Sequence, residues 1–151
     1  MKNVLWVDCC IRGEESRTLR LSRAFLDALP QDCAVTHLDL MQLQPRYFFG
    51  DYLEERQKLL EQGNLSHPRF DLAHQFAAAD AIVVSAPFWD LSFPALLKVY
   101  IEQVSLDGIT FASTEAGLVG RCRAERMVYL TTRGGFYTGD ELEMGSRYMQ
   151  A

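Results

Sequence analysis

Hydroxyl and arginine side chains gather in residues 9–18, the segment that follows the first apolar run of the sequence. Ser16 and Thr18 can donate hydroxyl hydrogen bonds, and Arg12 and Arg17 add positive charge. A helix that begins in this segment also offers unpaired backbone N–H groups and a partial positive charge. Together these groups fit a phosphate monoester. They fit a plainer interpretation equally well, in which Ser16 only caps the helix and the arginines form a solvated face.

An aromatic loop with the sequence APFWDLSFP occupies residues 86–94, directly after another apolar run. Aromatic and apolar residues between two prolines are unusual for an exposed turn. Such a rigid loop can present backbone N–H groups and apolar side chains to a flat ring. The alternative is a hydrophobic plug over the core.

A third loop, residues 132–137, carries the adjacent glycines Gly134 and Gly135. Glycine has no side chain, so two in succession let a ligand approach the backbone closely. Each of the three loops is a weak signal when it is taken alone.

The elements that must position these loops are strands and helices in alternation. Apolar runs at residues 4–7, 81–86 and 127–132 are continuous, which predicts strands that are covered on both faces of a parallel sheet. Residues 34–40 alternate between apolar and polar types, which predicts an edge strand.

Apolar residues at helical spacing fall between these strands, at residues 16–29, 51–62, 68–79 and 94–104. This order predicts a doubly wound α/β sheet. Ligands bind such sheets at the carboxyl ends of the strands, and all three loops leave such ends. A last helical pattern at residues 140–151 has no stop signal, so we expect the chain to finish inside a helix.

The composition limits the class of protein. The chain has 151 residues, of which 48% are hydrophobic and 23% charged, so we expect a single domain over residues 1–151. A net charge of -5 argues against nucleic acid as a partner. We expect no membrane span, because no run of about 18 apolar residues exists.

Cysteines and histidines do not suggest a metal site. The four cysteines form no Cys-x-x-Cys pair, which favours reduced thiols in a cytoplasmic protein. His37, His67 and His74 lack the spacing of metal ligands.

Two long blocks of the sequence resemble a known family. ADAIVVSAPFW at residues 79–89, followed by FPALLKVYIE at 93–102, is similar to the middle block of FMN-dependent NAD(P)H:quinone oxidoreductases and azoreductases. GITF at 108–111 and TRGG at 132–135 match later blocks in order and approximate spacing. The resemblance runs from the first residue to the last. It implies a flavodoxin-like sheet with strand order 2-1-3-4, non-covalently bound FMN, NADH or NADPH as electron donor, a quinone or azo acceptor, and a homodimer with the site at its interface.

The resemblance also assigns site residues by position. Ser16, Arg17 and Thr18 are expected to hold the FMN phosphate, the aromatic loop to border the isoalloxazine, and the glycine loop to meet its pyrimidine side. The cofactor-binding residues expected from the loops and the resemblance together are Cys10, Arg12, Ser16, Arg17, Thr18, Pro87, Phe88, Trp89, Asp90, Leu91, Thr132, Arg133, Gly134 and Gly135, with Tyr137 as the catalytic residue near the substrate.

Two residues depart from the family pattern. Cys9 or Cys10 stands where a serine is common, which removes a strong hydrogen-bond donor near the phosphate. Asp90 stands where azoreductases often have asparagine. A carboxylate near the flavin disfavours its anionic reduced form and so affects the redox potential.

The C-terminus departs as well, because family members continue with a fifth strand and another helix. We therefore expect a truncated domain in which the fifth strand is missing and residues 127–132 form an exposed sheet edge. The alternative function is a non-catalytic flavodoxin-like electron carrier or a truncated FMN-binding remnant. The long insertion at residues 47–68 favours the reductase, because small electron carriers usually lack it.

Overall fold

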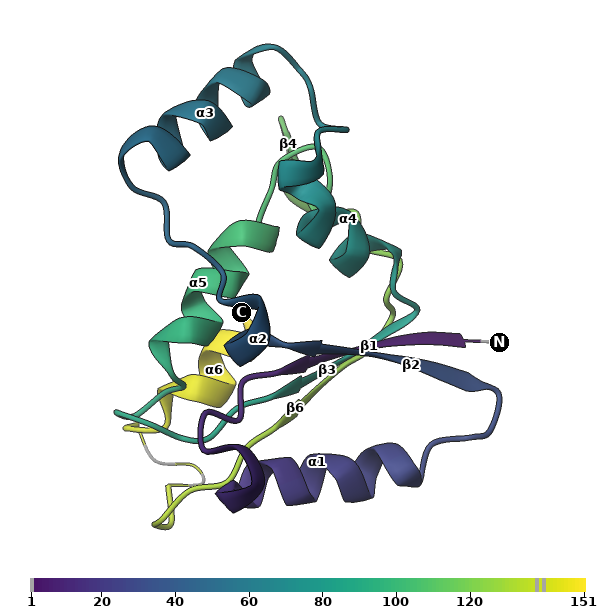
Figure 1. Cartoon of the computed structure of the whole chain (residues 1–151), viewed down its shortest axis with the longest axis vertical. Helices are drawn as coiled ribbons and strands as arrows, with labels where there is room; N and C mark the ends of the chain where they lie inside the picture. Colours follow the sequence, from purple (N-terminus) through teal and green to yellow (C-terminus); the bar gives the residue numbers. More distant parts are fainter. Residues whose placement is uncertain (1, 138, 140) are drawn as a thin grey trace.

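A parallel sheet of four strands forms the centre of the fold (Figure 1). The computed structural model describes residues 2–137, 139 and 141–151. The strands lie side by side in the order β2-β1-β3-β6, with β2 and β6 at the two edges. This confirms the expected order 2-1-3-4. The strands are β1 (Lys2–Asp8), β2 (Cys33–Asp39), β3 (Ala81–Ser85) and β6 (Met127–Leu130).

Helices cover both faces of this sheet. In Figure 1, α1 lies on one face, and α5 and α6 lie on the other, while α3 extends away from the sheet. The helices are α1 (Arg17–Asp27), α2 (Leu40–Leu43), α3 (Gly50–Glu61), α4 (Asp71–Ala78), α5 (Ala95–Val104) and α6 (Met144–Gln150), with short 3-10 helices η1 (Gly13–Glu15) and η2 (Pro68–Phe70).

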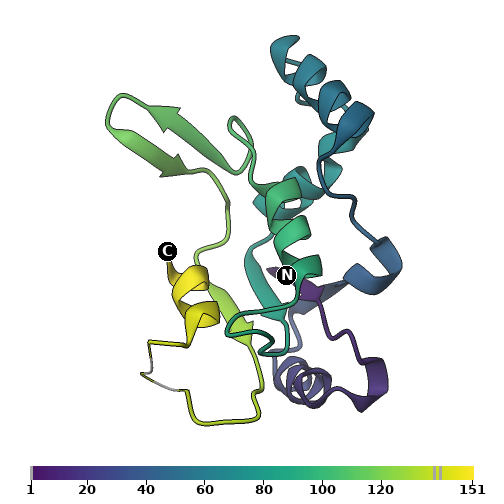
Figure 2. The ribbon, with the colours of Figure 1, turned by 90° about the vertical axis from the view of Figure 1, so that its left-hand side faces the viewer.

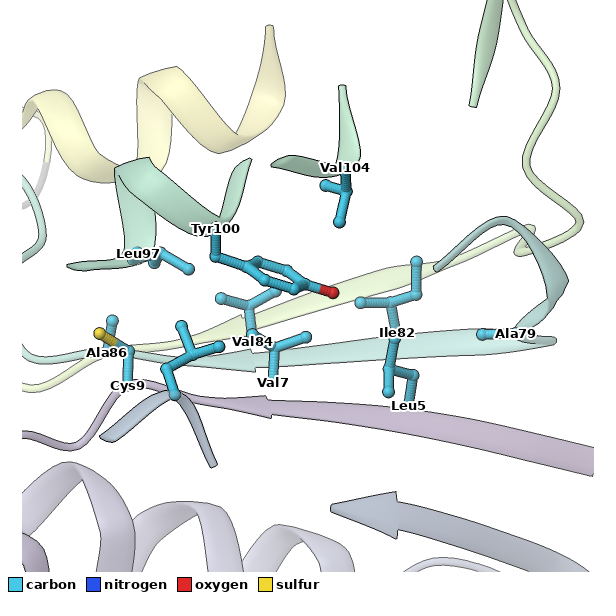
Figure 3. Close-up of a cluster of buried hydrophobic side chains, with 11 residues drawn as sticks. Leu5, Val7, Cys9, Ala79, Ile82, Val84, Ala86, Leu97, Tyr100 and Val104 are labelled. Atoms are coloured by element: carbon cyan, nitrogen blue, oxygen red, sulfur yellow. The ribbon is translucent and has the colours of Figure 1, made fainter. Parts of the chain in front are cut away.

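Alternate residues of the central strands point to opposite faces and are buried on both. One face packs against α5, whose Tyr100 lies over β1 and β3 in Figure 3. The other face packs against α1 through Leu19. This double burial explains why the apolar runs are continuous. The strand side chains toward α5 are Leu5, Val7, Ile82 and Val84, and those toward α1 are Val4, Trp6 and Val83.

The structure differs from the predicted elements in four places. Helix α2 at Leu40–Leu43 was not predicted, and Leu40 was expected in the preceding strand. The helix expected over residues 68–79 is divided into η2 and α4. An antiparallel hairpin of β4 (Phe111–Thr114) and β5 (Gly117–Gly120) was not predicted; it projects from the body in Figure 2. The last helix begins at Met144, and Asp140, where its pattern was expected to start, lies outside the described residues.

Candidate functional site

A cavity of about 300 Å³ lies at the carboxyl edge of the sheet, where the three loops meet. This volume lies at the small end of the range of ligand pockets. The structure thus brings together side chains from three separate parts of the chain, and ten of the fourteen expected cofactor-binding residues line the cavity. The full lining is Arg12, Glu15, Ser16, Arg17, Thr18, Pro87, Phe88, Trp89, Thr132, Arg133 and Gly134.

The amino terminus of α1 forms one end of the cavity. Ser16 is the N-cap of this helix, and its Oγ accepts a hydrogen bond from the Leu19 N–H at 3.2 Å. The next two residues, Arg17 and Thr18, have backbone N–H groups that no carbonyl within the helix can accept. Ser16 is therefore a cap, as the plainer interpretation proposed, and the helix end that it caps still lines a cavity.

The charge around the cavity is predominantly positive. Arg12, Arg17 and Arg133 line it together with a single acidic residue, Glu15. Arg12 forms an exposed ion pair with Glu15 at 3.0 Å. Within the described part of the chain, Arg17 is exposed and has no ion-pair partner. An anionic group at this end would therefore meet both an unpaired cation and a helix dipole.

A hydroxyl contact joins the first loop to the third. Thr18 Oγ1 lies 2.7 Å from Thr132 Oγ1, although the two residues are 114 positions apart in sequence. Thr18 is fully buried, so this contact lies at the base of the cavity. It holds the helix end and the glycine loop at a fixed separation.

The aromatic loop contains a tight turn. Trp89 and Ser92 exchange two backbone hydrogen bonds, at 3.2 and 2.9 Å. The two residues between them, Asp90 and Leu91, have positive φ angles of 48° and 66°. That pair of angles matches a type I′ turn, a conformation that glycine and asparagine adopt at lower cost than leucine.

This turn places Phe88 and Trp89 at the cavity, and Trp89 is 41% exposed. Asp90 and Leu91 do not line the cavity, so their expected contact with the flavin ring stays a prediction. The same applies to Gly135, which lies against the Tyr137 ring, and to Tyr137, which packs on Phe88 with ring centroids 4.9 Å apart.

Arg133 lies beside the aromatic loop. Its guanidinium carbon is 5.2 Å from the centre of the Phe88 ring, a cation–π distance. Its Nη1 is 3.7 Å from Oε1 of Glu143, which is long for a hydrogen bond. Nη1 is buried and makes no hydrogen bond within the described residues.

Glu143 is a residue of the site region that the sequence interpretation missed. Glu143 is buried, and its side chain caps α6 by accepting from the Ser146 N–H at 3.1 Å. The sequence offers little signal for this residue, because glutamate is not among the residue types that usually cap the amino terminus of a helix, and nothing near it indicates a partner ten residues away.

The adjacent cysteines lie under the cavity rather than in it. Both are fully buried, and the backbone N–H of Cys10 donates to Asp8 Oδ1 at 2.9 Å. Burial raises the pKa of the Cys9 thiol to about 12, and burial and then Asp8 raise the pKa of Cys10 above its usual range. Cys10 is not a lining residue, so its contact with the phosphate stays a prediction.

The histidines have structural partners. His37 stacks on Trp6 at 4.0 Å, and its Nε2 lies 3.1 Å from Asp8 Oδ2. His67 accepts from the Arg69 N–H, and His74 contacts the Leu65 carbonyl. Among residues 2–137, 139 and 141–151, no group of three or more His, Cys, Asp or Glu side chains is arranged to hold a metal ion, and no helix is long and apolar enough to cross a membrane.

A parallel sheet that gathers a helix terminus, basic side chains and an aromatic turn at its carboxyl edge defines an α/β protein with a nucleotide-type ligand site. The chain belongs to the flavodoxin-like family, whose model, described as a flavodoxin-like fold, matches residues 2–151. The fold class and the family resemblance are thereby confirmed.

Known relatives are enzymes. The chain is 37% identical over 155 residues to an FMN-dependent NADH:quinone oxidoreductase of Clostridium perfringens, and the match covers 99% of this chain and 78% of the relative. It is similar in structure to the azoreductase from Bacillus anthracis str. Sterne, with a TM-score of 0.84, 29% identity, and coverage of 99% of this chain and 79% of the other. An FMN-dependent NADH-azoreductase from Bacillus anthracis str. Ames Ancestor, solved in complex with FMN, shares the fold with a TM-score of 0.82 at 19% identity over 99% of this chain and 79% of that one.

Proposed function

We propose that this protein is an FMN-dependent oxidoreductase that passes reducing equivalents from NADH or NADPH to a quinone or azo acceptor. The observation that carries the proposal is the single cavity that collects ten of the fourteen residues expected to hold FMN. The names of the Clostridium perfringens relative and of the Bacillus anthracis azoreductases support the same activity.

The residues of the cavity fit FMN in charge and in shape. Arg17 and the amino terminus of α1 would hold the phosphate, because both favour an anion. Phe88 and Trp89 offer an apolar border for a flat ring, which fits the isoalloxazine. The Arg133 side chain lines the cavity and is 20% exposed, so its guanidinium can donate to a ring carbonyl.

When it is bound, FMN supplies hydride chemistry, taking hydride from the reduced nicotinamide and delivering it to the acceptor. The protein's own residues bind and orient. Trp89, exposed at the cavity, can stack against a planar donor or acceptor and exclude water. The Tyr137 ring packs against the Phe88 ring of the aromatic loop, and from there Tyr137 would contact the substrate.

A homodimer completes the proposal. Several aromatic side chains are exposed, both ahead of α3 and near the cavity, and large exposed aromatics are typical of interfaces. Among them Tyr47 is 67% and Phe49 is 74% exposed. Sedimentation should therefore give a dimer, and Phe49→Ser should weaken it; a monomer at all concentrations would contradict this part of the proposal.

The competing function is a flavodoxin-like electron carrier without turnover. The insertion that contains α3 supports the reductase, because it adds a helix away from the sheet that a small carrier does not need. Two measurements test the proposal. Added FMN should give the absorbance bands of a bound flavin. Without oxygen, the loaded protein should oxidise about one equivalent of NADH or NADPH per flavin, and more only when a quinone or azo dye is present. Absence of flavin binding would overturn the proposal, and binding without turnover would favour the carrier.

A further inference from the structure

One short segment, residues 143–145, contacts both loops at the aromatic end of the cavity. The Met144 N–H donates to the Leu91 carbonyl at 2.9 Å, so the segment supports the turn that follows Trp89. A Cβ built on Gly145 would lie 3.3 Å from the Ser92 carbonyl oxygen, which shows how closely the segment approaches that turn. Glu143 meanwhile faces Arg133 of the glycine loop.

Arg133 has both an aromatic ring and a carboxylate as neighbours. Its guanidinium carbon is 5.2 Å from the centre of the Phe88 ring, and its Nη1 is 3.7 Å from Oε1 of Glu143. The Arg133 side chain is only 20% exposed and lines the cavity. A guanidinium that has lost most of its water needs replacement partners, yet Nη1 has no hydrogen bond within the described residues.

Glu143 is itself almost fully buried, with 8% of its side chain exposed, and Arg133 is the cation with which it forms an ion pair. Its carboxylate already accepts from Ser146, so the carboxylate is fixed by α6. A fixed buried carboxylate restricts where the neighbouring guanidinium can lie, since separation of the two would leave a buried charge unpaired.

We propose that Glu143 is a positioning residue, which holds the Arg133 guanidinium over Phe88 at the wall of the cavity, so that the exposed part of the guanidinium can donate to an acceptor atom on the planar part of the bound ligand. This inference deepens the proposed function and rests on it. In this inference the Arg133 side chain binds the planar part of the ligand, and Glu143 affects ligand binding only by fixing the position of Arg133. A purely structural alternative is that Glu143 only caps α6.

Riboflavin is the appropriate probe, because it carries the flavin ring without the phosphate. Glu143→Gln keeps an oxygen that can cap Ser146 but removes the charge that holds Arg133. We expect this variant to bind riboflavin and FMN about tenfold more weakly, by the same factor for both, as a lost charge-assisted hydrogen bond implies. Arg133→Ala should show a similar loss, and the double variant should lose little more than Arg133→Ala alone. Glu141→Gln, which removes a charge from an exposed residue two positions before Glu143, is the matched control and should bind as the parent does.

Chemical rescue separates positioning from capping. Millimolar guanidinium should restore riboflavin affinity to Arg133→Ala, because the free ion can occupy the place that the Arg133 guanidinium leaves beside Phe88 and Glu143, whereas equal urea should not. The Arg133→Ala/Glu143→Gln variant should not be rescued. A loss in Glu143→Gln that adds fully to that of Arg133→Ala, or rescue that does not need Glu143, would overturn the inference.

Failure of this inference is distinguishable from failure of the proposed function. If the parent protein binds neither riboflavin nor FMN, the proposed function fails and the inference fails with it. If the parent binds both and Glu143→Gln binds them equally well, the inference alone fails. The unfolding temperature of each unliganded variant gives a readout independent of flavin, and we expect Glu143→Gln to unfold within about 2 °C of the parent, because the cap of α6 remains.

Discussion

Reversing the charge of Arg17 is the sharpest test of which end of the cavity holds the phosphate. Arg17 is exposed, lies in the first turn of α1 and lines the cavity, so its guanidinium can approach a phosphate without a change in the fold. A unit charge about 4 Å from another in water contributes about 1 kcal/mol. Arg17→Glu removes that attraction and adds a comparable repulsion. The expected loss is therefore about 2 kcal/mol, or roughly thirtyfold in the dissociation constant of FMN.

The assay compares FMN with riboflavin by titration of the unliganded protein. Riboflavin lacks the phosphate, so its affinity should change by less than about threefold in Arg17→Glu. The difference between the ligands should shrink as salt is raised, because exposed charges are screened. Arg20→Glu is the matched control, since Arg20 is exposed on the same helix but does not line the cavity. Equal losses for FMN and riboflavin, or an equal effect of Arg20→Glu, would refute the reasoning.

Three further outcomes are expected. Binding of FMN should quench tryptophan fluorescence. Trp89→Phe should abolish most of the quenching, because the other tryptophan, Trp6, is buried in β1; unchanged quenching in this variant would place Trp89 away from the ligand. Tyr100→Phe should leave the unfolding temperature unchanged or raise it by up to roughly 4 °C, because the buried Tyr100 hydroxyl has no hydrogen-bond partner among the described residues; a marked drop in calorimetry would reveal a partner. Met127→Lys should reduce self-association in light scattering, because Met127 is exposed on the edge strand β6 and a lysine there opposes strand pairing. Unchanged association would show that the β6 edge is not the surface through which the chains associate.

The central strands and the main helices could be predicted because local sequence determines them. The run at residues 81–86 is apolar at every position except Ser85, and a strand buried on both faces requires such a run. Ser16 before α1 and Pro94 before α5 marked helix starts correctly. The hairpin at residues 111–120 was missed because its four-residue strands are largely exposed and carry no apolar alternation.

Parts of the site could not be predicted, because they depend on contacts between distant residues. Nothing near Thr18 indicates that its hydroxyl meets Thr132, since the folded sheet alone brings them together. Glu143 looked like an ordinary helix residue for the same reason. The positive φ angles of Asp90 and Leu91 are a third case, because neither residue type favours a type I′ turn as glycine does, and the neighbouring segment stabilises it.

The burial of Cys9 and Cys10 acquires a chemical meaning if the acceptor is a quinone. Quinones are electrophiles that alkylate thiolates, so a protein that holds one repeatedly risks arylation of its own cysteines. Cys10 is only two residues before Arg12, which lines the cavity. Both thiols are nevertheless closed to solvent, and their raised pKa values disfavour the reactive thiolate. Cys33 is less buried, and self-inactivation would begin there rather than at Cys122, because burial raises the pKa of the Cys122 thiol as well.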